Sequence, residues 1–193
     1  MKFLLFFALL CPLAARAEGV RVEPRLFVKQ GHLFTSFGGA WLARGDYWLN
    51  PAASFSASYY LSESGGPEAR LLWFFSSLDE SAQKVAAATG FVPDARQPQA
   101  LLLAGWRQSL TYGKVALAGE AVHFDVQGAL HAGGLFTDRG LAPAVGASAG
   151  LLARLNRWVF LQLDLGLLLS FDQRQRGGAA LGLLPVLSAG AEL

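Results

Sequence analysis

The sequence has a single cysteine, Cys11, and it lies in a segment that resembles a cleaved signal peptide. Lys2 gives this segment a positive start, residues 3–13 form an apolar core, and Ala15-Arg16-Ala17 is a small-x-small cleavage motif. We expect cleavage after residue 17, with a retained anchor as the alternative. The apolar run is too short to span a bilayer as a helix. The mature chain would then contain no cysteine, which excludes disulfides and thiolate chemistry.

The mature chain also lacks an excess of either charge. The full sequence has 16 basic and 14 acidic residues, and cleavage removes Lys2 and Arg16 but no acid. The remaining charges balance, so there is no basic surface of the kind that nucleic acids require. We therefore expect no nucleic-acid partner.

A third absence concerns long apolar runs. Hydrophobic residues make up 53% of the chain, yet the two longest uncharged runs after the signal, 140–153 and 177–191, contain several glycines and a proline. Neither is a good spanning helix. High hydrophobicity without helical spans, in an exported chain, is typical of a closed transmembrane barrel, because lipid cannot satisfy an open sheet edge.

The clearest pattern in the sequence is the stretch 159–172. Its odd positions are all apolar, and its even positions include Gln162, Asp164, Ser170 and Asp172. A period of two places the apolar side chains on one face of a strand and the polar ones on the other. The stretch is longer than the strands of soluble sheets, about 5–6 residues, and long enough for the 9–11 or so that a tilted transmembrane strand needs.

Weaker versions of this pattern recur along the chain. We predict eight strands at about 32–43, 52–62, 68–77, 100–112, 122–136, 144–155, 159–172 and 179–193. The expected fold class is all-β, an eight-stranded antiparallel transmembrane β-barrel over residues 32–193, preceded by a periplasmic lead at 18–31. An even strand number returns both chain ends to the periplasmic side. The longer loops, 44–51, 77–99, 137–143 and 172–178, would then be extracellular, and the connections 63–67, 113–121 and 156–157 periplasmic.

One extracellular loop carries a helix signal. Ser77-Leu78-Asp79-Glu80 is a capping box and Gly90 is a suitable C-terminal stop, which predicts a short helix at 79–89. This loop is our candidate surface for a protein partner. Its candidate contact residues are Asp79, Glu80, Lys84, Phe91 and Arg96.

An eight-stranded barrel is only wide enough for side chains to fill. The alternation directs nine charged or titratable side chains inward, namely Glu68, Arg70, Arg107, His123, Asp125, His131, Arg154, Asp164 and Glu192. Because an unpaired buried charge is costly, we expect a cross-strand polar network that plugs the lumen. A proton or ion path is the alternative. In the fourth strand this phase puts Thr111 inside and Tyr112 outside, and leaves Gln108 on the lipid face.

His123 and Asp125 lie two positions apart on one face, about 7 Å from each other, and His131 follows on the same wall. This arrangement raises the possibility of catalysis or metal binding. A His-x-Asp pair without a third ligand or nucleophile is a weak signal. We therefore expect no catalytic residues, no metal and no cofactor.

Two motifs resemble those of a known family. They are Thr111-Tyr112-Gly113-Lys114 and Val122-His123-Phe124-Asp125, followed by Gly133-Gly134, with the segment 58–64 upstream. The pattern is similar to that of the small outer-membrane β-barrel proteins of myxobacteria and their relatives. The residues that carry the motif are Tyr112, Gly113, Lys114, His123, Phe124 and Asp125. Some members of this family are similar to envelope components of gliding motility. Read from chemistry alone, Tyr112-Gly113-Lys114 predicts an interfacial tyrosine, a turn glycine and a snorkelling lysine, or a docking point for a periplasmic partner.

These observations favour a protein of the Gram-negative outer membrane that is not an enzyme. It would act as an anchor or interaction component of an envelope complex, with gliding motility as the process that the resemblance implies. Its partners would be outer-membrane lipid and other envelope proteins. A lipid- or peptide-modifying enzyme using His123, Asp125 and His131, and a narrow transport path, are the alternatives.

Overall fold

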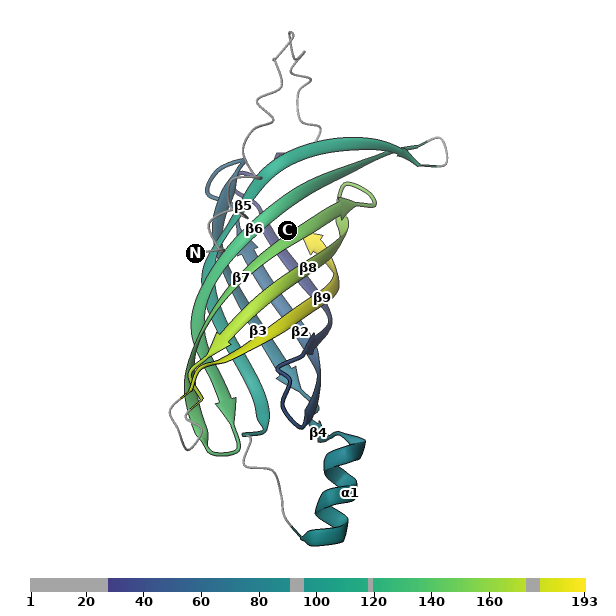
Figure 1. Cartoon of the computed structure of the whole chain (residues 1–193). Helices are drawn as coiled ribbons and strands as arrows, with labels where there is room; N and C mark the ends of the chain where they lie inside the picture. The colour runs from purple at the N-terminus through teal and green to yellow at the C-terminus, as the bar shows by residue number, and fades with distance from the viewer. Residues whose placement is uncertain (1–27, 91–95, 118–119, 173–177) are drawn as a thin grey trace, which may run out of the picture.

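The chain folds into a closed, eight-stranded, antiparallel transmembrane β-barrel (Figure 1). The computed structural model describes residues 28–90, 96–117, 120–172 and 178–193, so the predicted signal peptide lies outside the described residues. The wall consists of β1 (Leu33–Leu42), β2 (Trp48–Tyr59), β3 (Gly65–Phe74), β5 (Pro98–Leu117), β6 (Glu120–Thr137), β7 (Gly140–Arg154), β8 (Val159–Ser170) and β9 (Ala180–Glu192). A two-residue strand, β4 (Ser77–Leu78), pairs with the start of β2.

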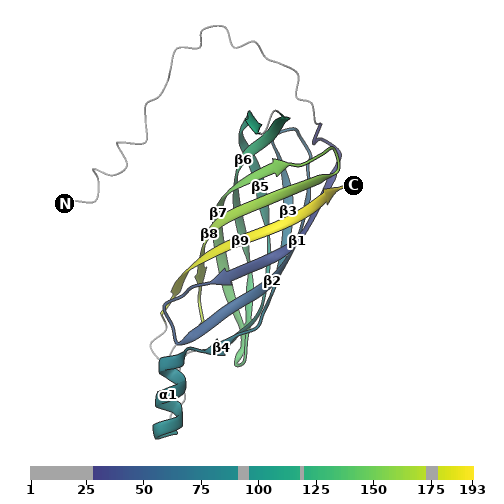
Figure 2. The same cartoon turned by 90° about the vertical axis from the view of Figure 1, so that its right-hand side faces the viewer.

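The barrel closes between its first and last strands. Figure 2 shows β9 lying between β8 and β1, and β1 pairs with β2 along its other edge. We call the end of the barrel next to Leu33 and Glu192 the terminus end, and the opposite end the helix end. The even strand number and the loop lengths predict that the terminus end faces the periplasm.

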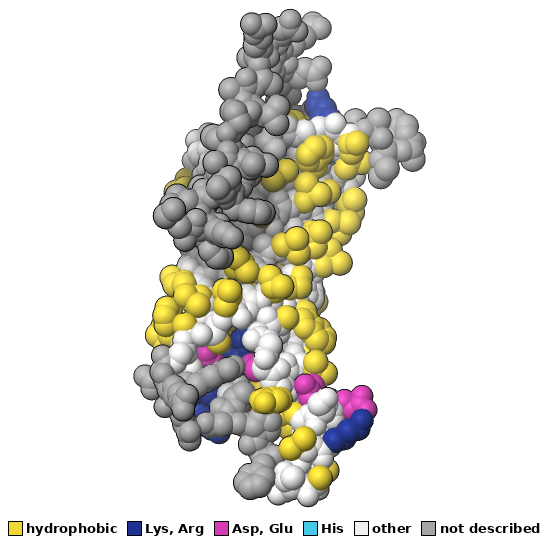
Figure 3. Space-filling view, viewed as in Figure 1, with side chains coloured by type: hydrophobic (Ala, Val, Ile, Leu, Met, Phe, Trp, Pro, Cys, Tyr) yellow, Lys and Arg dark blue, Asp and Glu magenta, His cyan; other side chains and the backbone are white. Residues whose placement is uncertain are grey.

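The strict alternation of β8 shows why these residues form a wall. Its odd residues are exposed on the outside, where Leu165 is 65% exposed, while Asp164 on the inside is 1% exposed. The same pattern exposes Phe37, Leu102 and Leu130 elsewhere on the wall. Hydrophobic side chains are spread over the visible wall of the barrel (Figure 3). A surface this apolar suits lipid rather than water.

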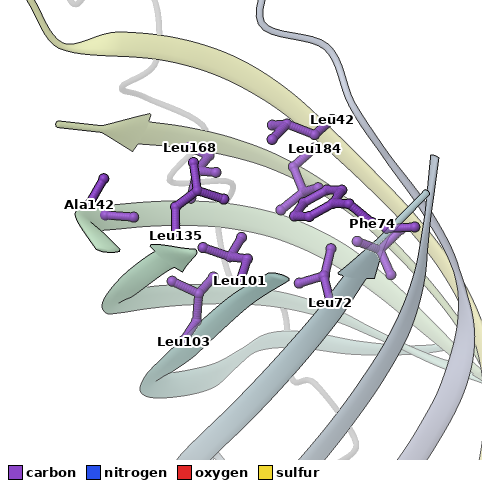
Figure 4. Close-up of a cluster of buried hydrophobic side chains, with 12 residues drawn as sticks. Leu42, Leu72, Phe74, Leu101, Leu103, Leu135, Ala142, Leu168 and Leu184 are labelled. Atoms are coloured by element: carbon purple, nitrogen blue, oxygen red, sulfur yellow. The ribbon is translucent and has the colours of Figure 1, made fainter. Parts of the chain in front are cut away.

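One half of the lumen, toward the helix end, is filled with hydrophobic side chains (Figure 4). Leu42, Leu72, Leu101 and Leu135 have no exposed surface, and Phe74 is 5% exposed. The alternation of the strands predicts the polar side chains inside the barrel but not this apolar cluster. Inward-facing leucines cannot be recognised from the sequence, because a leucine fits either face of a barrel wall.

The predicted helix at 79–89 is confirmed as α1 (Glu80–Thr89), between β4 and β5. Asp79 is its N-cap and its carboxylate accepts a hydrogen bond from the Ala82 backbone amide at 2.6 Å. Gly90 ends the helix with φ of 73°, a conformation that glycine adopts without strain. The helix projects from the helix end of the barrel (Figure 1). Within the part of the chain that the structure describes, no helix has the length and the hydrophobicity needed to cross a membrane.

The segment 113–121, predicted as a turn or irregular piece, is instead the extended tip of a hairpin. β5 continues to Leu117 and β6 resumes at Glu120. Pairing of β3 with β5 ends at Gln108, and pairing of β6 with β7 ends at His123, so the tip extends past both neighbours. We call β5 and β6 beyond these points the ribbon; it projects from the terminus end (Figure 1).

A β-bulge in β5 overturns another expectation. Ser109 pairs with Gln127 but Thr111 pairs with Val126, so Leu110 is an extra residue in the ladder. An extra residue moves every later side chain to the opposite face. Thr111 is therefore exposed rather than inside, and Tyr112 turns toward His123 instead of lying outside as an interfacial residue.

Gly113 is likewise not a turn residue. It pairs with Phe124, and a Cβ at Gly113 would lie 2.3 Å from the Phe124 ring. The glycine leaves room for that ring to lie across the strand. Other strand ends differ from the prediction by a few residues. Trp48 already belongs to β2 and Gly65 to β3, and Asp138-Arg139 alone connects β6 to β7 in place of the predicted loop 137–143.

Candidate functional site

A buried ionic cluster crosses the middle of the lumen. Arg107 donates from Nε to Glu68 Oε2 at 2.8 Å and from Nη2 to Asp164 Oδ2 at 3.0 Å. Arg70 Nη2 lies 3.0 Å from Glu68 Oε1 and also pairs with Asp164. His131 Nε2 lies 2.9 Å from Glu68 Oε2. The structure thus brings five of the nine predicted lumen residues together, and we call these five the central cluster.

The central cluster joins opposite walls. Glu68 and Arg70 come from β3, Arg107 and His131 from β5 and β6, and Asp164 from β8 on the far side of the barrel. Two carboxylates face two guanidinium groups, so the formal charges of these four side chains balance. Each ion is nearly inaccessible to water, and pairing is what makes such burial tolerable. A chain of ion pairs from wall to wall blocks the lumen at this level.

Neutral side chains complete the hydrogen bonding of the central cluster. Gln127 Oε1 accepts from Arg107 Nη1 at 3.0 Å, and its amide nitrogen donates to the Tyr60 hydroxyl at 3.0 Å. Gln162 Nε2 donates to Asp164 Oδ2 at 2.7 Å. The alternation predicts that these side chains face inward, but no local pattern indicates which charged group each of them contacts.

The terminus end of the lumen is closed by Lys29, which is not among the predicted lumen residues. Lys29 is 3% exposed; its Nζ donates to Ser109 Oγ at 2.6 Å, forms an ion pair with Asp125, and lies 5.0 Å from the centre of the Tyr60 ring. The Glu63 carboxylate accepts from the Lys29 backbone amide at 3.2 Å. The structure thus places Lys29, part of the expected lead 18–31, inside the barrel mouth. A single lysine in a segment without periodicity does not indicate that its side chain enters the barrel.

The four other predicted lumen residues lie at this mouth, outside the central cluster. Arg154 pairs with Glu192, whose other oxygen lies 3.1 Å from His32 Nδ1. His123 Nδ1 is hydrogen-bonded to the Tyr112 hydroxyl. Asp125 is engaged by Lys29, as described. The small hollow between these side chains is also lined by Phe124 and Leu152.

The alternative based on His123, Asp125 and His131 needs these three side chains to act together. They contact Tyr112, Lys29 and Glu68, respectively. Among the described residues, no group of three or more histidine, cysteine, aspartate or glutamate side chains could hold a metal ion. The geometry therefore provides no shared site for an enzyme that would use these three residues.

The helix end of the lumen is closed by ion pairs above the apolar cluster. Arg44 Nη1 lies 2.9 Å from Asp172 Oδ2, and its Nη2 lies 2.6 Å from Asp46 Oδ2. The same guanidinium donates to the backbone carbonyl of Arg96 at 3.0 Å. Asp172, predicted to lie at the start of the last loop, is completely buried.

The candidate partner residues fall into two groups. Asp79 caps α1, and Glu80 and Lys84 form an exposed i,i+4 pair on it at 2.6 Å. Arg96 is tied to the barrel rim through its carbonyl. Phe91 lies outside the described residues. The motif residues Tyr112, Gly113, Lys114, His123, Phe124 and Asp125 are neighbours across β5 and β6, at the base of the ribbon.

Comparisons with known proteins return structural likenesses only. No family model matches the chain, and no curated protein matches it. A crystal structure of Ail, the attachment invasion locus protein of Yersinia pestis, is similar at 11% identity and a TM-score of 0.45, covering 85% of this chain and 99% of that one. A second Ail structure, in complex with the heparin analogue sucrose octasulfate, gives the same values. A de novo designed transmembrane β-barrel is similar at 12% identity and a TM-score of 0.44, covering 86% of this chain and 98% of that one. Likenesses this weak assign no function to the chain.

Proposed function

We propose that this protein is an outer-membrane β-barrel that serves as a non-enzymatic anchor or interaction component of a cell-envelope complex. The observation that carries the proposal is the filled lumen. Arg44 and the apolar cluster fill the helix end, the central cluster crosses the middle, and Lys29 fills the terminus end. A barrel of this kind offers a partner its projections rather than a passage.

The two projections are candidate contact surfaces. On α1 the only buried residue is Ala82, and Val85 is 56% exposed, so the helix is not held by the barrel core. Its caps stabilise it locally instead. On the ribbon, the edge of β5 from Thr111 to Leu117 pairs with β6 on one side, and no other described strand pairs with it on the other. An unpaired strand edge can accept an extended segment of another protein.

The partners would be other proteins of the envelope, in the periplasm or in the same membrane. The family resemblance adds gliding motility as the process to test first. Its motif lies at the base of the ribbon, so the residues that define the resemblance are close to one proposed contact surface.

Site-specific photocrosslinking in the source organism tests the proposal. A photoreactive residue replaces Val85 on α1, Val115 on the ribbon or, as control, Leu165 on the lipid-facing wall. All three side chains are at least half exposed. We expect discrete protein adducts at Val85 or Val115 and none at Leu165. Absence of protein adducts at both projections in a correctly assembled barrel would contradict an interaction role.

Planar-bilayer recording tests the transport alternative separately. A lumen filled at three levels predicts no stable conductance steps for the wild-type barrel. Steps that persist in the wild type, and that an Arg107 substitution leaves unchanged, would show that the central cluster does not block the lumen.

A further inference from the structure

A groove crosses the lipid-facing wall over β5, β6, β7 and β8. Its floor consists of small residues, Gly128, Ala147 and Ala149, and larger side chains, Leu130, Leu165 and Leu167, stand around them. The groove has a volume of about 470 Å³. A second hollow of about 330 Å³ shares Leu130, Ala147 and Leu167 with it and continues to Leu181 on β9. Together they form one track, which we call the wall groove.

One end of the wall groove is polar. Trp106 Nε1 donates to Gln108 Oε1 at 3.1 Å, and no described residue accepts a hydrogen bond from the Gln108 amide nitrogen. Gly65 pairs with Gln108, and a Cβ there would lie 2.5 Å from Gln108 Oε1 and 2.9 Å from Trp106 Nε1. The glycine therefore leaves the room that this side-chain pair occupies. A donor that faces lipid without an acceptor is costly, so its position calls for a ligand that accepts.

The polar end lies at the rim of the barrel, at the terminus end. Gly65 is the first residue of β3, beside the turn at the terminus end. From Gln108, the row of paired residues runs through Gly128 and Ala149 to Leu165, in the middle of β8. Because the strands of such barrels are tilted, a row that crosses them rises from the rim toward the bilayer centre. Tryptophan and polar donors at one end and an apolar track leading inward match the polarity profile of a lipid.

We propose that the wall groove binds one glycerophospholipid, with an acyl chain in the groove and an ester carbonyl that accepts a hydrogen bond from Gln108 Nε2. The groove is continuous with the lipid-facing wall, so membrane lipid is the molecule that reaches it. An ester carbonyl is an acceptor without a proton to donate, which complements the amide donor. This site does not depend on the interaction role proposed above.

The test measures lipid that the full-length mature barrel retains, by native mass spectrometry after release from nanodiscs. The nanodiscs contain either a diester phosphatidylethanolamine or its diether analogue, which lacks the ester carbonyls. For Gly128→Leu, the added Cβ would meet its nearest heavy atom, Leu110 Cδ1, at an ordinary 3.6 Å, so the side chain can enter the groove. Gln108→Leu removes the donor and keeps the volume similar. Ala57→Leu, on the outer face of β2 away from the groove, is the matched control.

The wild type should retain one diester lipid, with at least a fivefold preference over the diether. Gly128→Leu should lower retention about tenfold, and Gln108→Leu should abolish the ester preference, while Ala57→Leu behaves as the wild type. Heat-modifiable gel migration confirms that each variant is folded, and Ala149→Leu replaces Gly128→Leu if the latter does not assemble. Equal retention in Gly128→Leu and the control would overturn the proposal, as would equal binding of both lipids by the wild type. Dimers that Gly128→Leu disrupts without changing lipid retention would assign the groove to a second copy of the chain.

Discussion

Replacing Arg107 with methionine removes the residue that contacts both carboxylates of the central cluster. Methionine keeps much of the volume and the flexibility of the side chain but carries no charge. Arg107 has five hydrogen bonds in the structure, two each to Glu68 and Asp164 and one to Gln127. After the change, two buried carboxylates would share the single positive charge of Arg70.

The size of the effect follows from the burial of the cluster. Arg107 is 2% exposed, and Glu68 and Asp164 are 3% and 1% exposed. Removing one partner of a buried ion pair costs about 3–5 kcal/mol, because the other charge remains in a medium of low polarity. We expect a loss near the lower figure, since Arg70 also contacts both carboxylates.

A compensating change separates electrostatics from packing. Asp164→Asn in the same chain leaves Glu68 facing Arg70, which restores neutrality. Neighbouring groups in one network couple by roughly 0.5–3 kcal/mol, and we expect a favourable coupling in the upper half of that range. The double variant should therefore be more stable than the sum of the single losses predicts.

Urea unfolding of the barrel in detergent micelles measures these free energies, with tryptophan fluorescence and heat-modifiable migration as parallel probes. The five tryptophans of the chain include Trp73 and Trp106 on the wall. An Arg107→Met barrel as stable as the wild type would refute the argument that pairing holds this cluster. Simple additivity with Asp164→Asn would show that the losses come from packing rather than charge.

Three further changes have expected outcomes. Lys29→Met leaves the buried Asp125 carboxylate without this ion pair, so unfolding should become easier by about 3 kcal/mol, and adding Asp125→Asn should recover part of the loss in the same assay. Asp79→Ala removes the N-cap of α1 and should cost about 1 kcal/mol of local helix stability; hydrogen exchange should speed up in α1 while the midpoint of barrel unfolding stays unchanged. Gly105→Ala would place a Cβ 1.9 Å from the Leu130 carbonyl and should impair assembly, whereas Gly39→Ala meets no atom within 4 Å and should be tolerated; folded yield on gels measures both.

The fold could be predicted because the wall repeats one signal many times. The alternation of β8 and the serines of β2 fix which face looks inward, and eight such segments give a closed barrel. The capping box before Glu80 and the glycine after Thr89 likewise fix α1 by local chemistry. These features depend on residues that are close together in the sequence, so they can be predicted from one sequence alone.

What could not be predicted depends on contacts between distant residues. The bulge at Leu110 inserts one residue into the ladder, and no local motif predicts it. Thr111 and Tyr112 therefore lie on the opposite faces of the strand from those expected. The contact of Lys29 with Ser109 and Asp125 joins a non-periodic segment to two strands. The apolar cluster could not be predicted because a leucine such as Leu72 is compatible with both the lumen face and the lipid face of a strand.

The division of the lumen explains how a barrel without disulfides can display its projections. The apolar cluster supplies packing at the helix end, whereas the central cluster joins β3 to β8 and thereby favours one register, because a slip of one residue would turn Glu68 and Arg70 toward lipid. Both sources of stability lie inside the wall. The ribbon and α1 contribute little to either, since α1 buries only Ala82 and β5 beyond Gln108 pairs only with β6 among the described strands. Changes to these projections should therefore alter partner binding while leaving barrel stability intact, and coupled losses of both would show that the projections belong to the folding core.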